Sequence, residues 1–152
     1  MNYKWILVSV FTFVAIAFGY YAISPLFRNI KVDEALPSTL NAQPVQSDRQ
    51  PVVDGIVTGT TGHPASGNAR IVYADGTPYL RYENFKTING PDIFVYLSKD
   101  LEAKEFISLG KVKATEGNIN YKIPANVNLE EYKYVLTWCK AFGVLFNNAQ
   151  IN

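Results

Sequence analysis

The chain has few of the residues on which most catalytic and metal sites depend. Its 152 residues include one cysteine, Cys139, and one histidine, His63. A single cysteine excludes an intramolecular disulfide, a C-x-x-C redox motif and covalent c-type haem attachment. Two such ligands are too few for a structural zinc or blue-copper site, so we predict no metal centre. Because G-x-S-x-G and P-loop motifs are also missing, we do not expect hydrolytic or phosphoryl-transfer catalysis, and a non-catalytic module is favoured over an enzyme.

Charge is missing from a long stretch near the N-terminus. Residues 5–27 carry no charged side chain and are mostly apolar. About 20 apolar residues suffice for a helix that crosses a bilayer, and Trp5 and the Tyr20–Tyr21 pair suit its two interfaces. We therefore predict a transmembrane signal anchor over residues 1–27. The alternative is a cleaved signal peptide ending at Ala15-Ile16-Ala17, although the apolar run continues for ten residues beyond that site.

The rest of the chain divides into a linker and one domain. A short N-terminal tail before an anchor usually stays inside, so we expect the C-terminal domain outside the cytoplasmic membrane. Residues 28–50 have no apolar periodicity and predict a flexible linker. Residues 51–152 suffice for one domain, with ten basic and ten acidic residues. Because no basic stripe is present, we expect no nucleic-acid partner.

The domain is rich in strand patterns and poor in helix patterns. Asp75-Gly76-Thr77-Pro78 is typical of a turn between two hairpin strands. Short helical turns are expected at 101–104 and 129–132. Many short strands with Gly and Pro turns indicate an all-β fold, an antiparallel β-sandwich or flattened barrel. The strands are expected at 51–57, 69–74, 79–85, 92–98, 106–109, 118–123, 134–139 and from 142 to 151.

Cys139 lies in the most apolar stretch of the C-terminal half, residues 134–146. Regular alternation puts it on the face of Thr137, opposite to Trp138. Four roles remain open: a buried core residue, a free thiol, a ligand to a bound group, or half of a bridge to another chain. A reactive thiol requires a nearby cation or helix N-terminus. The adjacent Lys140 is expected on the opposite face, so it is a weak candidate for that cation.

Several blocks of the domain, in order and spacing, resemble the DM13 family. The resemblance implies a β-sandwich that acts as an extracytoplasmic electron-transfer module. It also implies that Cys139 serves as a redox thiol or as a ligand to a prosthetic group such as haem. The matching blocks are Gly62-His63 with Gly67 to Ile71, Tyr79 to Phe85, Asn89 to Ser98, Ser108 to Lys111, Gly117 with Asn120 to Pro124, and Val135 to Phe142 with Phe146 and Ala149.

A haem site would require more than the cysteine. A thiolate ligand in an apolar pocket is chemically sound, and Trp138, Phe142 and Phe146 are candidates to line that pocket. His63, in a Gly- and Pro-rich loop, is a candidate second axial ligand or hydrogen-bond partner. The alternative for the aromatic residues is ordinary sandwich core, and for His63 an exposed loop imidazole.

Together these features predict a membrane-anchored extracytoplasmic domain that takes part in electron transfer or thiol redox through Cys139. Its expected partners are the membrane and a redox protein or prosthetic group. The alternative function is a structural or adhesive extracytoplasmic domain in which Cys139 is buried and inert. A third hypothesis is a Cys139 bridge between two anchored chains.

Overall fold

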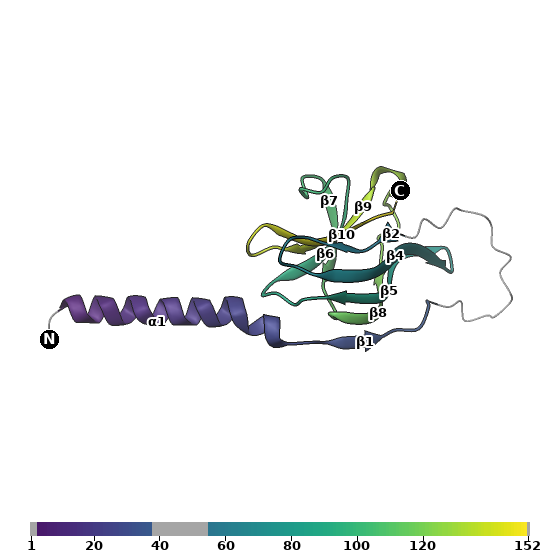
Figure 1. Ribbon diagram of the computed structural model, residues 1–152. Helices are drawn as coiled ribbons and strands as arrows, with labels where there is room; N and C mark the ends of the chain where they lie inside the picture. The colour runs from purple at the N-terminus through teal and green to yellow at the C-terminus, as the bar shows by residue number, and fades with distance from the viewer. Residues whose placement is uncertain (1–2, 38–54, 152) are drawn as a thin grey trace.

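The uncharged N-terminal run forms one long helix. In the computed structural model, which describes residues 3–37 and 55–151, helix α1 (Tyr3–Ile23) projects from the rest of the molecule (Figure 1). None of its residues is buried, and its length and composition suit a membrane span or a signal sequence. A short 3₁₀ helix, η1 (Ser24–Phe27), follows it. Pro25 ends the α-helix because proline lacks a backbone N–H and disfavours helical geometry in the residue before it.

Two five-stranded sheets make up the β-domain. The strand order is β1-β8-β5-β4-β2 in one sheet and β3-β10-β9-β6-β7 in the other. All described neighbours are antiparallel except β1 and β8. The predicted sandwich is therefore confirmed, and its described strands do not close into a barrel. The elements are β1 (Lys31–Asp33), β2 (Gly55–Ile56), β3 (Thr58–Gly59), β4 (Ala65–Ala74), β5 (Thr77–Thr87), β6 (Ile93–Ser98), β7 (Phe106–Lys111), β8 (Glu116–Lys122), η2 (Leu129–Glu131), β9 (Tyr134–Cys139) and β10 (Val144–Gln150).

The first residues of the predicted linker belong to the sandwich. β1 extends the first sheet by pairing in parallel with β8, and Thr115 N donates a hydrogen bond to Ile30 O at 2.8 Å. The structure therefore differs from the expected flexible linker at 28–50 in its first part, while residues 38–50 lie outside the described residues. Composition did not reveal this strand because a three-residue edge strand is held by backbone bonds and needs no apolar pattern.

Apolar side chains from both sheets fill the space between them. At the centre the ring of Tyr82 stacks on Phe85, with centroids 4.2 Å apart. The Tyr82 hydroxyl lies 3.5 Å from Thr137 Oγ1 in β9, so a polar contact also joins the two sheets. Burial raises the pKa of Tyr82 well above its ordinary value of 10.0, which keeps the phenol protonated. The main core comprises Val57, Ala69, Leu80, Tyr82, Phe85, Val95, Leu97, Ala114, Ile119, Tyr121, Ile123, Val135, Ala149 and Ile151.

The predicted hairpin at residues 75–78 is confirmed. Ala74 pairs with Thr77, which leaves Asp75 and Gly76 as a two-residue turn between β4 and β5. Both residues have positive φ, 48° and 71°. That geometry suits the twist of the flanking strands and explains why Asp-Gly occupies the turn.

Gly117 offers a test of the docking of β1 on the sheet. A methyl group at this position would overlap the carbonyl oxygen of Val32 in β1. We expect Gly117→Ala to displace β1 and to lower the free energy of unfolding by more than the roughly 1–3 kcal/mol that backbone strain alone costs. Thermal unfolding of the full chain in detergent measures the loss, and hydrogen exchange of the Thr115 amide reports release of β1.

Gly110→Ala is the matched control for this variant. Gly110 has φ of +113°, close to the +121° of Gly117, but a methyl group there would meet no atom within 4 Å. This variant should show the backbone strain alone and leave exchange of the Thr115 amide unchanged. Equal losses in the two variants, with no change in exchange, would contradict the docked position of β1.

Candidate functional site

Cys139 is the last residue of β9 and has no exposed surface. It pairs with Ile93 of β6 on one side and with Val144 of β10 on the other. Its relative exposure is 0%, and no hydrogen bond to its sulfur is found among the described residues. The next residue, Lys140, is already exposed. The thiol is therefore sealed, but it lies at the very end of a strand.

The side chains around Cys139 form a small cluster beside the main core, and Val112 packs against both. The buried members are Cys139, Ile93 and Phe146, and the half-buried Ile88 and Val112 pack against them. Thr137, two residues earlier on the same face, instead contacts Tyr82 of the main core. The register of β9 against β6 is unbroken, which keeps Thr137 and Cys139 on one face. The strand passes from the main core to the small cluster between these two positions.

His63 reaches the same cluster through Phe146. Its ring stacks on the Phe146 ring, with centroids 4.1 Å apart and planes inclined by 27°. His63 Nδ1 lies 3.1 Å from Thr60 Oγ1, and that hydroxyl is within 2.8 Å of Leu145 O. The direction of the His63–Thr60 contact depends on the tautomer of the ring, and no hydrogen bond joins His63 to Cys139.

Trp138 and Phe142 lie away from the Cys139 side chain. Trp138 is half-buried on the opposite face of the sheet, between Phe94 of β6 and Leu145 of β10. Phe142 lies in the turn between β9 and β10 and is 47% exposed. Of the four predicted site residues, the structure brings only Cys139 and His63 to one cluster.

Ile93, Ile88 and Val112 are the neighbours of Cys139 that the sequence did not indicate. Alternation along residues 92–98 placed Ile93 on one face of a strand. It did not show that this strand pairs with β9, because the order of strands in a sheet leaves no local pattern. Phe146 was among the expected neighbours, and the structure places it in the cluster.

The packing around Cys139 does not fit a haem. Ile93 and Phe146 fill the space beside the thiol. A methyl group added at Gly90 would lie 2.9 Å from Phe146 Cζ and 3.1 Å from Ile93 Cγ2, so the far side of this cluster is equally close-packed. A porphyrin face next to the sulfur would require these side chains to leave. This packing therefore leaves no room for a haem beside Cys139.

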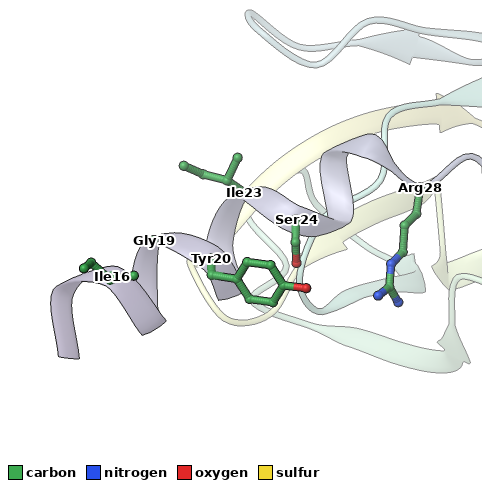
Figure 2. Close-up of a pocket in the computed structure, with 6 residues that line it drawn as sticks. All are labelled: Ile16, Gly19, Tyr20, Ile23, Ser24 and Arg28. Atoms are coloured by element: carbon green, nitrogen blue, oxygen red, sulfur yellow. The ribbon is translucent and has the colours of Figure 1, made fainter. Parts of the chain in front are cut away.

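An open groove lies elsewhere, along the last turns of α1 and the residues that follow. It has a volume of about 570 Å³ and contains none of the predicted site residues. Tyr20 extends along it toward Ser24 and Arg28 (Figure 2). The groove is apolar at its helical end and positively charged at the other, an arrangement that suits a lipid better than an aqueous ligand. Its lining residues are Ile16, Gly19, Tyr20, Ile23, Ser24 and Arg28.

A group of charged side chains lies on the outer face of the first sheet. Glu83 Oε1 accepts hydrogen bonds from Arg70 Nη2 at 2.7 Å and from Arg81 Nε at 2.8 Å. Arg81 also donates to Asn120 Oδ1 and to the carbonyl oxygen of Glu34, just beyond β1. The bond from Arg70, followed by that from Arg81, lowers the pKa of Glu83 below its ordinary value of 4.5. Two guanidinium groups thus share one carboxylate, and Arg70 Nε is buried without a hydrogen-bond partner among the described residues.

The chain matches a protein family by sequence. A family model described as "Electron transfer DM13" matches residues 58–151, more than half of the chain. The match covers the described strands from β3 to β10 and includes Cys139 and His63. No curated protein and no solved structure matches the chain.

Two substitutions at Cys139 test its burial. We expect Cys139→Ser to lower the free energy of unfolding by about 1–3 kcal/mol, because it buries a hydroxyl that has no partner. Cys139→Ala should cost less, since it removes the contacts of the sulfur without adding a polar group. Chemical denaturation of the full chain in detergent measures both. A serine variant as stable as the unsubstituted protein would show that the thiol is in contact with water.

The Glu83 cluster predicts how stability depends on pH. A carboxyl whose pKa is lowered by folding contributes stability above its unfolded pKa and loses it as the pH falls through the folded value. The free energy of unfolding should therefore decrease as the pH falls below about 4.5, and Glu83→Gln should flatten that decrease. Glu102→Gln, which removes an exposed carboxylate with its lysine partner 3.9 Å away, should leave the slope unchanged. Parallel slopes for Glu83→Gln and the unsubstituted protein would contradict the role of the cluster.

Proposed function

The chain belongs to the DM13 family, and on this premise we propose that it is a membrane-anchored extracytoplasmic domain that takes part in electron transfer or thiol redox through Cys139. The observation that carries the proposal is the position of Cys139. The thiol lies in a small apolar cluster at the end of a strand, one residue from an exposed turn.

The anchor is supported by the dimensions of α1. Its 21 residues at 1.5 Å per residue give a length of about 32 Å, close to the ~30 Å hydrocarbon thickness of a bilayer. A soluble helix would cover an apolar face, but α1 buries no residue. Trp5 near one end and Tyr20 near the other suit the two interfaces.

The small size of the Cys139 cluster supports access to the thiol. Parts of a protein with few buried contacts open locally at a lower free energy than the global core. The cluster has three buried members, whereas the main core has 14. Movement of the β9–β10 turn would uncover the thiol while the main core stays packed. The closed state then protects the sulfur, and opening admits a partner.

A single thiol determines what the redox step can be. In the open state the Cys139 thiolate attacks one sulfur of a disulfide on a partner protein. The partner S–S bond breaks, a mixed disulfide forms, and the departing sulfur leaves as a thiolate that takes up a proton. Cys139 is thereby oxidised and one partner sulfur is reduced. Because the chain has no second cysteine, a partner thiol must resolve the mixed disulfide.

The complete burial of Cys139 favours a second candidate function. A buried cysteine without a polar partner is commonly an inert core residue. In that case the protein is a structural or adhesive extracytoplasmic domain. Its outer sheet face, where Tyr96 stacks on the 43%-exposed Phe106, would be the surface for interaction.

Alkylation kinetics distinguish the two functions. We expect a small thiol reagent to modify Cys139 slowly in the folded full chain, and Phe146→Ala to speed the reaction at least tenfold. The reason is that Phe146 closes the small cluster, and a loss of about 1.4 kcal/mol in closing free energy raises the open population about tenfold. Mass spectrometry of the protein in detergent follows the modification, and Cys139→Ser provides the blank.

Leu80→Ala is the control for global unfolding. Leu80 is fully buried in the main core, so its truncation destabilises the fold without removing contacts in the Cys139 cluster. It should change alkylation much less than Phe146→Ala does. If both variants speed the reaction in proportion to their loss of global stability, Cys139 reacts only in the unfolded chain, and the structural function is correct.

A further inference from the structure

The turn between β9 and β10 carries an exposed apolar tip. Residues 141–144, Ala-Phe-Gly-Val, contain no charge and are all exposed. The relative exposure of Phe142 is 47% and that of Val144 is 37%. Gly143 has φ of +64°, which closes the turn and holds Phe142 at its tip. An aromatic side chain in such a position has no structural role within the sandwich.

The tip contacts α1. The rings of Phe18 and Phe142 meet edge to face, with centroids 6.3 Å apart, and the hairpin reaches back toward the helix in Figure 1. Phe18 lies five residues before Ile23, the end of α1, which corresponds to about 7.5 Å along the helix axis. If α1 spans the bilayer, this depth lies inside the hydrocarbon. The tip of the hairpin then lies there too.

The connection between α1 and the β-domain is too short to hold the domain away from the end of the helix. Three residues, 28–30, join η1 to β1, and an extended chain of that length reaches about 10 Å. Asn89 Nδ2 also donates to Arg28 O at 3.2 Å, and Thr115 N binds Ile30 O. The β-domain is therefore held at the end of the helix by its own first sheet.

The residues beside the tip suit a membrane interface. Lys140 precedes the tip, and its Nζ lies 5.5 Å from the centroid of the Phe94 ring on the outer sheet face. A lysine so placed can keep its ammonium group among lipid phosphates while its stem stays in apolar surroundings. Arg28 lies at the polar end of the groove on α1. Its guanidinium group can likewise contact lipid phosphates.

We propose that residues 141–144 insert into the outer leaflet of the bilayer that holds α1, as a second membrane contact beside the helix. The occupant of this surface is the acyl-chain region of the lipid, with headgroup phosphates near Lys140 and Arg28. The proposal rests on the proposed membrane anchor. It also places the Cys139 end of the sandwich at the membrane surface.

Depth-dependent fluorescence quenching tests this placement. The full chain with Cys139→Ala would carry one new cysteine, labelled with an environment-sensitive fluorophore, and would be reconstituted in phosphatidylcholine vesicles. With Phe142→Cys, or with Val144→Cys as a second variant, we expect blue-shifted emission and strong quenching by lipids spin-labelled near the headgroup. A water-soluble quencher should have little effect on either probe.

Two further positions supply matched controls. Tyr73→Cys replaces an aromatic residue of similar exposure, 54%, near the β4–β5 turn. That turn lies at the opposite end of the sandwich, because β5 runs for about 30 Å from Pro78 to Thr87, beside Asn147. Its probe should respond only to the water-soluble quencher. Val14→Cys, in the middle of α1, reports the anchor itself and should respond to lipids spin-labelled deep in the acyl chains.

The outcomes separate the two levels of the proposal. A deep probe at position 14 with water-exposed probes at both 142 and 144 would overturn insertion of the tip and leave the anchor intact. A probe at position 14 that no lipid label quenches would refute the anchor, and with it the insertion. Quenching by lipid labels at 14, 142 and 144, together with none at 73, is the result that insertion requires.

Discussion

The parallel pairing of β1 with β8 determines where the β-domain lies relative to α1. Without it, the residues after α1 would be a tether, and the sandwich would be free to move at some distance from the helix. With it, three residues separate η1 from the first strand, and the backbone bond between Thr115 and Ile30 fixes the direction in which the chain leaves the helix. Arg81 strengthens the same attachment through the carbonyl oxygen of Glu34. The position of the β9–β10 turn beside α1 follows from this attachment.

The apolar interior of the sandwich consists of a large main core and a small cluster, and Cys139 lies in the small cluster. Most of the buried surface lies in the main core, where it supplies the stability of the domain. The small cluster around Cys139 adds little to that total but encloses the only thiol of the chain. A thiol in the main core would be reached only by unfolding, since the whole core must part to expose it. A thiol at the end of β9 lies in the small cluster instead, so the proposed reactivity would require only local opening there.

The sequence predicted the parts of this structure that follow local patterns. Alternation along 134–139 placed Cys139 with Thr137 and opposite Trp138, and the Asp75-Gly76 pair located a hairpin. Each signal depends on residues close together in the chain.

The neighbours of Cys139 could not be predicted in the same way, because Ile93 and Phe146 reach it through strand order and a bulge in β10. β1 was missed for a similar reason, since its partner lies some 85 residues away. The apolar character of Phe142 suggests a pocket residue, but the structure places it in an exposed turn, which composition does not indicate.

The proposed opening of the Cys139 cluster and the proposed insertion of the tip involve the same hairpin, so we expect the two to be coupled. Residues 141–144 begin two positions after the thiol, and β10 supplies Phe146 from the other side of the turn. Movement of the turn away from the sandwich uncovers Cys139. If that movement drives Phe142 deeper into lipid, the bilayer favours the open state, and if it withdraws Phe142, the bilayer favours the closed state. Full burial of a phenylalanine side chain is worth about 1.5–3 kcal/mol, which corresponds to a change in the open population of roughly ten- to a hundredfold. The reactivity of the thiol would then depend on the membrane as much as on the protein, and a chain held in lipid would differ in rate from the same chain in detergent.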